Sequence, residues 1–206
     1  MKFKHSFTCL ISGPTQSGKT VFVQTLLQNR HLFDTEFDEV LWHYGVWQSA
    51  YDKMAGVRFV EGLPRIEDFD GKPKLVIIDD LMHESNDDVG KIFTKYSHHK
   101  NISVIYITQN LFHRNKNSRD LTLNSHYIVV FKNPRDKLQF RYLARQIMPG
   151  QEKFAQDSYE DATSKPHGYL LIDLKQQTEE HLRLVTDIFD EYPTYYIPTR
   201  NSRGYK

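Results

Sequence analysis

Cysteine is almost absent from this chain, since Cys9 is the single cysteine among 206 residues. No C-x-x-C pair can occur, and the patterns H-E-x-x-H and G-x-S-x-G are missing as well. These absences argue against a metalloprotease-type metal site and against a hydrolase that uses a serine nucleophile. Because Cys9 stands in an apolar run, we expect a packed thiol in a reducing compartment.

Long hydrophobic runs are missing too. Runs such as Leu75 to Ile78 are far too short to span a bilayer, and the segment from Met1 to His5 lacks the apolar stretch of a secretory signal. We therefore expect a soluble intracellular protein with no membrane partner. The chain is nevertheless 39% hydrophobic and 26% charged, which suits one packed domain and excludes a disordered chain.

An excess of charge of either sign is the third absence. The formal net charge is only +1, so any contact with nucleic acid must come from a local patch of cations. Histidine is frequent, but His98 and His99 have no acidic or cysteine neighbours at the spacing of metal ligands. We expect surface histidines and no histidine metal site.

What the chain does have is a phosphate-binding motif near its amino terminus. The pattern G-x-x-x-x-G-K-[ST] is matched by Gly13, Pro14, Thr15, Gln16, Ser17, Gly18, Lys19 and Thr20. The apolar, β-prone run from Phe7 to Ile11 precedes the motif, and apolar residues at helical spacing from Phe22 to Leu27 come after it. Strand, loop and helix stand in the order that this motif requires, which disfavours the alternative of a glycine-rich turn before a surface helix.

The residue types of this loop suit a nucleotide bound with Mg²⁺. Gly13 and Gly18 allow consecutive backbone N–H groups to point inward at phosphate oxygens, and the start of the following helix adds its dipole. Lys19 supplies a positive charge for the β- and γ-phosphates, and the Thr20 hydroxyl can bind Mg²⁺. We predict ATP and Mg²⁺ as cofactors.

Strand-like and helix-like segments alternate along the rest of the chain. Strands are predicted at residues 39–44, 57–60, 75–78, 102–108 and 127–131, and helices at 87–96, 134–148 and 151–161. The helix at 134–148 has Asn133 as its cap and Pro134 at its first position. The alternation predicts an α/β P-loop NTPase fold of the ASCE/RecA-like type, with a mainly parallel sheet covered by helices on both faces.

The ends of the pattern complete the predicted organisation. Residues 66–74 are interpreted as a surface loop, and residues 168–174 and 181–186 as an antiparallel strand pair that closes the sheet. We assign residues 1–190 to one P-loop ATPase domain. Residues 191–206, which are rich in tyrosine and proline with late basic charge, are predicted to be an extended tail.

Two further groups of polar residues come directly after predicted strands and should lie at the same sheet edge as the loop. The run Leu75 to Ile78 ends in Asp79 and Asp80, as in a Walker B element: Asp79 would act on Mg²⁺ through water beside Thr20, and Asp80 would orient or deprotonate the attacking water. Many such ATPases have Glu at the second place, so Glu84 is a substitute base. The alternative is an Asp-Asp turn that ends a strand.

Gln109 ends the strand after Asp79, where its amide could contact both the γ-phosphate and the attacking water. The next loop contains three cations, Arg114, Lys116 and Arg119. They suit an arginine finger for a neighbour's phosphate, contacts to a nucleic-acid backbone, or a solvated loop. Arg135 is a second finger candidate, with a structural role at a helix start equally open.

Five stretches in this order resemble a known family. They are residues 13–20, 59–64 (Phe-Val-Glu-Gly-Leu-Pro), 75–82 (Leu-Val-Ile-Ile-Asp-Asp-Leu-Met), 106–112 (Tyr-Ile-Thr-Gln-Asn-Leu-Phe) and 123–136 (Leu-Asn-Ser-His-Tyr-Ile-Val-Val-Phe-Lys-Asn-Pro-Arg-Asp). Together they resemble the genome-packaging ATPases of large DNA viruses, poxviruses included, and of Polinton-like and adintovirus-like elements, in the FtsK–HerA branch of P-loop ATPases. The likeness covers about residues 5 to 190, and its last two stretches are the more specific ones.

The resemblance implies an ATPase that forms a homo-oligomeric ring and drives double-stranded DNA into a viral capsid or its portal vertex. It implies that Lys19 and Thr20 hold nucleotide and Mg²⁺, and that Gln109 senses the γ-phosphate. Asp79 and Asp80 would serve the metal and the water, and Arg119 would be the finger supplied to the next subunit. The implied location is the nucleus or a cytoplasmic viral factory of an infected host, or the virion, with no secretion.

Two other functions use the same loop. A nucleotide or small-molecule kinase would usually need an arginine-rich lid and a substrate site, neither of which the sequence identifies. A nucleotide-binding adaptor would bind DNA or capsid without turnover. A GTPase is disfavoured because the guanine motif N-K-x-D is absent.

Overall fold

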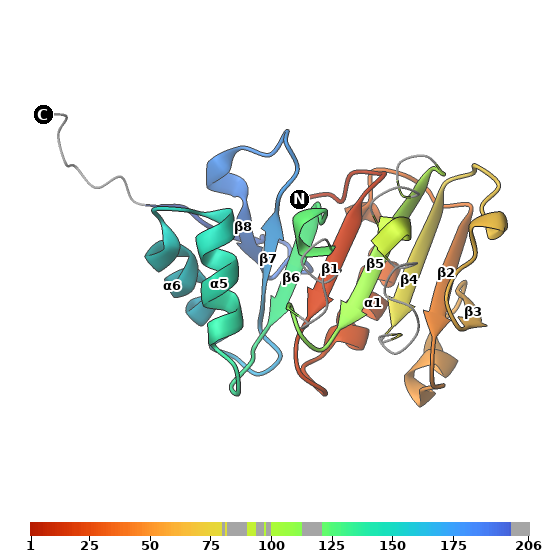
Figure 1. Cartoon of the computed structure of the whole chain (residues 1–206), viewed down its shortest axis with the longest axis horizontal. Helices are drawn as coiled ribbons and strands as arrows, with labels where there is room; N and C mark the ends of the chain where they lie inside the picture. The colour runs from red at the N-terminus through yellow and green to blue at the C-terminus, as the bar shows by residue number, and fades with distance from the viewer. Residues whose placement is uncertain (80, 82–89, 94–96, 98–99, 113–120, 199–206) are drawn as a thin grey trace, which may run out of the picture.

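The computed structural model describes residues 1–206 except residues 80, 82–89, 94–96, 98–99, 113–120 and 199–206. In the described part of the chain, one nine-stranded sheet has the order β3-β2-β4-β5-β1-β6-β7-β8-β9 (Figure 1). The strands are β1 (Thr8–Ser12), β2 (Glu39–Tyr44), β3 (Arg58–Glu61), β4 (Lys74–Asp79), β5 (Ile102–Thr108), β6 (Tyr127–Phe131), β7 (Tyr169–Asp173), β8 (Leu184–Thr186) and β9 (Thr194–Tyr196).

The sheet is parallel from β3 across to β6 and antiparallel from there to β9. Strands β1, β4 and β5 are buried along their whole length, which explains why they are continuous apolar runs and do not alternate. The predicted α/β class, the parallel sheet and the closing antiparallel pair of β7 and β8 are confirmed.

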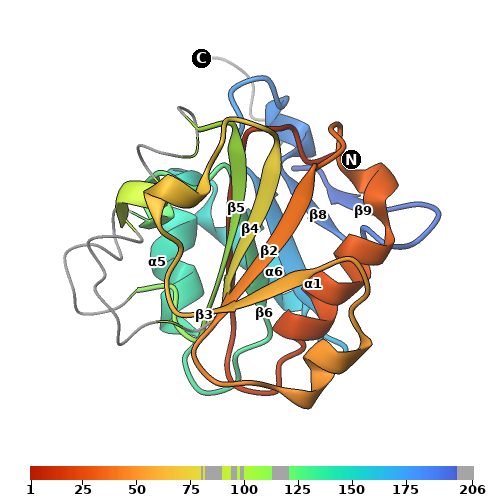
Figure 2. The same ribbon diagram turned by 90° about the vertical axis from the view of Figure 1, so that its right-hand side faces the viewer.

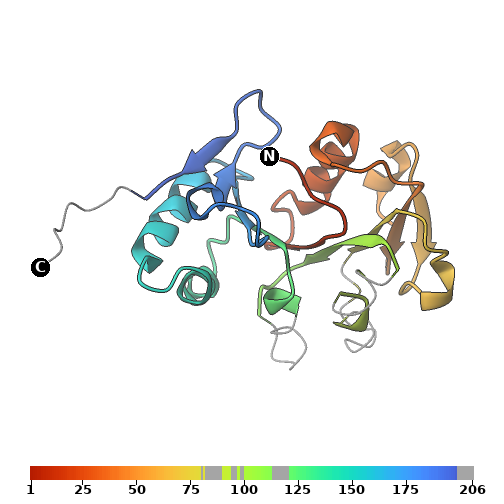
Figure 3. The same cartoon turned by 90° about the horizontal axis from the view of Figure 1, so that it is seen from above.

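Helices cover both faces of the sheet, as predicted. The helices that the structure describes over their whole length are α1 (Lys19–Gln28), α5 (Leu138–Ile147) and α6 (Glu152–Ala162), and the short 3-10 segments described in the same way are η1 (Arg30–Leu32), η2 (Ser49–Lys53), η3 (Ile66–Asp68) and η5 (Glu180–Leu182). Figures 2 and 3 show α1 on one face and α5 with α6 on the other. Phe22 of α1 packs in one core with Cys9 and Ile11, whereas Phe140 of α5 packs in a second core with Leu10 and Val76.

Cys9 is fully buried and has no disulfide partner, so the predicted packed thiol is confirmed. Burial raises the pKa of the Cys9 thiol, which keeps it protonated and a poor nucleophile. Among the helices that the structure describes, none is long and apolar enough to cross a membrane.

The helix predicted from Pro134 begins four residues later, at Leu138. The Asn133 side chain does act as a cap, but its Oδ1 accepts hydrogen bonds from the backbone N–H groups of Arg135 (3.1 Å) and Asp136 (3.2 Å) and closes a turn. Asp136 Oδ1 in turn accepts a bond from the N–H of Leu138. Asn133 was therefore correctly predicted to be a cap. The turns closed by the Asn133 and Asp136 side chains lie between Asn133 and the first residue of α5.

Three other boundaries differ from prediction. The predicted surface loop at 66–74 contains η3 and ends in β4, whose first residue Lys74 is buried. The predicted strand at 181–186 is a strand only from Leu184, because the preceding residues form η5. Part of the predicted tail is the edge strand β9, and Tyr196 donates a hydrogen bond to Asp161 Oδ2 of α6 (2.7 Å). Of the predicted helix at 87–96, residues 90–93 are helical and the rest lies outside the described residues.

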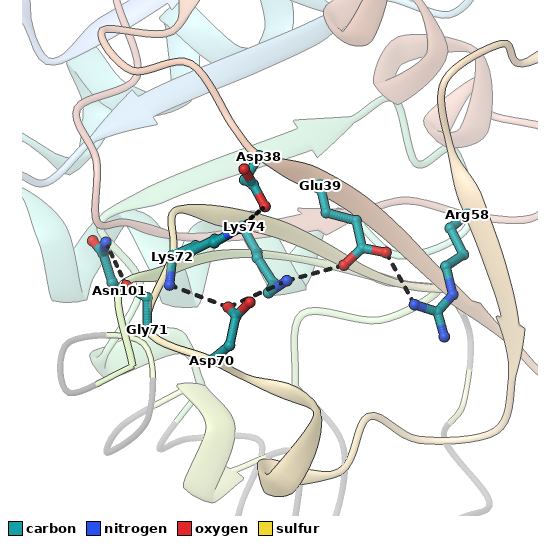
Figure 4. Close-up of polar contacts among 8 residues, drawn as sticks. All are labelled: Asp38, Glu39, Arg58, Asp70, Gly71, Lys72, Lys74 and Asn101. Atoms are coloured by element: carbon teal, nitrogen blue, oxygen red, sulfur yellow. Dashed lines mark hydrogen bonds and ion pairs between the residues drawn. The ribbon is translucent and has the colours of Figure 1, made fainter.

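A cluster of charged side chains makes a buried lysine tolerable at the start of β4. The Lys74 side chain is 7% exposed, and its Nζ lies 3.0 Å from Glu39 Oε2 and 3.3 Å from Asp70 Oδ1 (Figure 4). Burial opposes the charge of Lys74, but the hydrogen bonds to these two carboxylates outweigh it and raise its pKa. The hydrogen bond from Lys74 also lowers the pKa of the Glu39 carboxyl, with help from Arg58 at 3.0 Å. The cluster joins β2, β3 and β4 at the edge opposite the phosphate loop.

We expect Lys74→Ala to lower the free energy of unfolding by about 2 to 3 kcal/mol, because buried hydrogen bonds to charged groups are lost. Thermal unfolding should show a melting temperature lower by about 4 to 12 °C for a domain of this size. Lys72→Ala is the matched control, since its side chain is 63% exposed and lies 3.6 Å from Asp38. The control should lose less than about 1 kcal/mol. Equal melting temperatures for the two variants would contradict a stabilising role of the cluster.

Candidate functional site

The structure places the carboxyl ends of β1, β4 and β5 side by side, as predicted from the sequence. Ser12 at the end of β1 is in register with Thr108 at the end of β5, and Asp79 at the end of β4 is in register with Ile107. The backbone N–H of Gly13 donates to the carbonyl of Thr108 (3.3 Å), which brings the start of the loop beside Gln109. One sheet edge therefore presents the loop, a carboxylate and an amide.

The loop has the conformation of an anion cradle. Gly18 has a φ of 106° and Gln16 a φ of 65°, so the chain curls through the left-handed region just before α1 begins. A Cβ at Gly13 would lie 2.6 Å from both Phe131 Cβ and Ser17 Oγ, which means that only glycine fits there. The backbone N–H of Ser17 donates to the carbonyl of Pro14 (3.2 Å) and closes the turn.

The polar side chains of the loop suit a phosphate. Lys19 Nζ donates to the carbonyls of Gly13 (2.7 Å) and Pro14 (3.0 Å), so its ammonium group is held across the concave side of the turn. Ser17 Oγ is buried and finds no hydrogen-bond partner among the described residues. A buried hydroxyl without a partner is costly, and a bound phosphate oxygen would satisfy it. The residues present therefore fit a nucleotide phosphate.

A pocket of about 650 Å³ opens on the α1 side of the loop. Its walls are Thr15, Gln16, Ser17, Gly18, Lys19, Thr20, Val21, Phe22, Thr25, Gln48, Phe131, His167, Tyr169 and Phe189. Aromatic rings beside a phosphate cradle are the surroundings that suit a nucleoside. Burial raises the pKa of Tyr169, so its ring stays neutral in this wall.

Sequence reasoning missed the distant wall of this pocket. His167 Nδ1 lies 3.2 Å from the carbonyl of Ser17, 150 residues earlier in the chain, and the His167 ring lies over Gly18. Phe189 packs against Phe22 of α1 with ring centroids 5.0 Å apart. No motif marks these residues, because β7 and the segment after β8 bring them to the loop only in the folded chain.

A second pocket of about 590 Å³ lies on the other side of the loop. It is lined by Pro14, Thr15, Gln16, Gln109, Asn110, Asn133, Pro134, Arg135, Asp136 and Gln139. The structure thus brings two predicted site residues, Gln109 and Arg135, to the loop, and both are exposed to solvent. The predicted residues Asp80, Glu84, Arg114, Lys116 and Arg119 lie outside the described residues.

Asp79 and Thr20 are the predicted metal ligands. Asp79 is 5% exposed at the end of β4, and Tyr51 of η2 donates a hydrogen bond from its hydroxyl to Asp79 Oδ2 (2.8 Å). In the described part of the chain, no group of three or more His, Cys, Asp or Glu side chains could hold a metal. A hydroxyl, one carboxylate, water and nucleotide phosphates are the ligands that Mg²⁺ commonly takes, so the residue types of Thr20 and Asp79 fit Mg²⁺.

No family model and no curated protein matches the chain. Among solved structures, the genome packaging NTPase B204 from Sulfolobus turreted icosahedral virus 2 in complex with AMP is 12% identical, with a TM-score of 0.55 over 94% of this chain and 98% of that chain. Its complex with ATP-gammaS is 14% identical with the same coverage and TM-score. EssC (ATPases 2 and 3) from Geobacillus thermodenitrificans is 11% identical, with a TM-score of 0.51 over 96% of this chain and 41% of that chain. These likenesses show that the chain has the fold of these NTPases.

Proposed function

We propose that this protein is an ATP-hydrolysing motor of the FtsK–HerA superfamily that moves double-stranded DNA into a viral capsid. The observation that carries the proposal is the phosphate cradle, with Lys19 held across it, at the sheet edge where the strands that lead to Asp79 and Gln109 also end. The fold likeness supports it, because a virus protein that matches over 98% of its own length is a genome packaging NTPase.

The nucleotide would lie along the start of α1. Its phosphates would accept hydrogen bonds from the loop N–H groups and from Lys19, and the aromatic pocket of His167, Tyr169 and Phe189 would hold the nucleoside. In this pose the loop would lie between two pockets. The nucleobase would occupy the pocket on one side, and Gln109 lines the pocket on the other.

Thr20 and Asp79 would hold Mg²⁺, which when bound supplies positive charge to the β- and γ-phosphates. The Tyr51 hydroxyl fixes the orientation of the Asp79 carboxylate by donating a hydrogen bond to Oδ2. Gln109 would orient the attacking water and report the presence of a γ-phosphate, while Asp80, with Glu84 as its substitute, would take the proton from that water.

We further propose that the active unit is a homo-oligomeric ring in which Arg119 of one subunit reaches the nucleotide of the next. Arg135 is the second finger candidate, and it would act on the nucleotide of its own subunit, because it lines the pocket beside Gln109. The ring would dock on the capsid or its portal vertex in the infected cell.

The experiment is ATP turnover measured across protein concentration, with the phosphate product identified, on wild type and Arg119→Ala. A shared site predicts turnover per subunit that rises with concentration, release of inorganic phosphate, and a loss of about a thousandfold in Arg119→Ala. Transfer of phosphate to a small acceptor, independent of concentration and of Arg119, would contradict the motor and favour a kinase. Nucleotide binding without any turnover would favour an adaptor.

A further inference from the structure

Helix α5 carries a row of cations on a chain that has almost no net charge. Lys137, Arg141 and Arg145 are spaced four residues apart. They therefore form one stripe along the side of the helix, which begins at its N-cap Lys137. The helix itself, Leu-Gln-Phe-Arg-Tyr-Leu-Ala-Arg-Gln-Ile, contains no acidic residue. A net charge of +1 over 206 residues makes this concentration of positive charge notable.

The stripe is exposed to solvent. Phe140, Leu143 and Ala144 are the buried residues of α5, and the three cations lie exposed along the flank of the helix, where Lys137 lines one hollow together with Phe140. Figure 2 shows α5 on the face of the sheet opposite α1. The pocket of about 650 Å³ is lined by residues of α1 and by none of α5. The positive charge is therefore on a surface that the nucleoside pocket does not use.

These cations are only weakly neutralised. Within the described residues, Lys137 and Arg141 have no ion pair, whereas exposed Lys153 on the neighbouring helix α6 is paired with Asp157. Arg145 faces one acid: the N–H of Gly150 lowers the pKa of Glu152, and Arg145 adds to that effect. Most of the positive charge on α5 thus remains available to an outside anion.

The spacing of the stripe suits a nucleic-acid strand. Four residues of helix rise about 6 Å, so the three cations extend over about 12 Å. One strand of DNA presents a phosphate about every 3.4 Å along the axis, which gives about three to four phosphates in that length. Tyr142, which is 57% exposed beside the stripe, carries a hydroxyl that can donate to a phosphate oxygen.

The same helix is tied to the nucleotide side of the sheet. Gln139 Oε1 accepts a hydrogen bond from the N–H of Leu111 (2.8 Å), and Gln139 Nε2 donates to Asn110 Oδ1 (3.3 Å). Asn110 and Leu111 come directly after Gln109 beyond β5, and Gln139 lines the same pocket as Gln109. The first turn of α5 is therefore bonded directly to the strand end where the γ-phosphate would be sensed.

We propose that the exposed face of α5, formed by Lys137, Arg141, Arg145 and Tyr142, binds the phosphate backbone of double-stranded DNA. The proposal rests on the proposed function, because it identifies the surface by which the motor holds its DNA. An acidic protein surface would need matching carboxylates, whereas DNA offers the regular row of anions that the stripe fits.

The test compares the triple variant Lys137→Ala/Arg141→Ala/Arg145→Ala with wild type in binding a fluorescent duplex of about 30 base pairs across salt concentration. Three lost phosphate contacts should reduce the slope of log affinity against log salt by about 2 to 3 and weaken binding by at least about tenfold. The control Lys2→Ala/Arg30→Ala/Lys53→Ala removes three exposed cations elsewhere and should leave the slope unchanged. ATP turnover without DNA should be the same in all three proteins.

Each other outcome separates the two proposals. If wild type binds the duplex and the triple variant keeps its salt slope and affinity, α5 is not the DNA surface and the proposed function stands. If the triple variant loses only self-association, or only binding to an acidic protein, the stripe is a protein interface and the proposal fails. If wild type shows no DNA binding and no DNA-stimulated turnover, both proposals fail. Two single variants keep the test decisive should the triple variant not fold. Arg141→Lys keeps the positive charge and should bind the duplex more tightly than Arg141→Glu.

Discussion

Replacing Lys19 by alanine is expected to lower ATP turnover by at least about a hundredfold, which is the loss found when one preorganised charge-stabilising donor is removed. Lys19 Nζ lies within hydrogen-bond distance of two loop carbonyls, at 2.7 and 3.0 Å, so its ammonium group already lies across the loop that would hold the phosphates. An alanine offers neither the charge nor the donors. ATP turnover under saturating nucleotide, together with ATP affinity, measures the effect.

The control for Lys19→Ala is Lys2→Ala, which removes an exposed lysine from the amino-terminal segment and should keep wild-type turnover. Thermal unfolding of both variants separates a chemical effect from loss of the fold. A folded Lys19→Ala protein with turnover within about threefold of wild type would show that the loop at residues 13–20 is not the site of hydrolysis, since the loss expected for a missing donor is far larger.

Asp79→Asn should lower turnover by about 10- to 100-fold, the usual loss when a group that acts on a metal through water is changed. The substitution keeps the shape of the side chain and an oxygen that can accept the Tyr51 hydroxyl, so β4 should stay in place. Because the negative charge is removed, the concentration of Mg²⁺ needed for half-maximal turnover should rise. A Mg²⁺ titration of ATP turnover measures both effects.

Tyr51→Phe is the matched variant for Asp79→Asn. It deletes the 2.8 Å hydrogen bond to Asp79 Oδ2 and keeps the carboxylate, so we expect a loss of about 1 kcal/mol in stability and only a small change in turnover. If Tyr51→Phe lowered turnover as much as Asp79→Asn, with no change in Mg²⁺ dependence for either, Asp79 would be a structural partner of Tyr51 and not a metal ligand.

The parts of the site that could be predicted are those written in contiguous residues. In the loop at 13–20, Gly18 stands where the backbone has a positive φ and Gly13 stands where a Cβ would clash. The motif predicts both positions from the order of the residues. Asp79 and Gln109 could be placed at one edge because buried parallel strands are continuous apolar runs, and the residues that end such strands must meet at their carboxyl ends.

The parts that could not be predicted depend on contacts between distant segments. His167 and Phe189 reach the loop through antiparallel strands whose register no local pattern reveals. The sequence around Lys74 is typical of a polar loop, because burial of this lysine is possible only with Glu39 and Asp70 beside it. The predicted helix start at Pro134 was wrong because the side chains of Asn133 and Asp136 compete with helix formation for the same backbone N–H groups.

The surface on α5 was also invisible to composition, because a net charge of +1 hides three aligned cations. Their alignment results from the helical repeat, and their exposure results from which face of α5 packs against the sheet. The link through Gln139 to Asn110 gives the proposed motor a short connection between nucleotide state and DNA contact.

The rate of ATP hydrolysis by the wild-type protein with and without double-stranded DNA, at a concentration that saturates turnover per subunit, tests the proposed DNA motor most directly. A motor that acts on DNA predicts release of inorganic phosphate that is several times faster when DNA is present, and a loss of both rates in Lys19→Ala. Hydrolysis that is the same with and without DNA, in a protein that also fails to bind the duplex, would contradict a motor that acts on DNA.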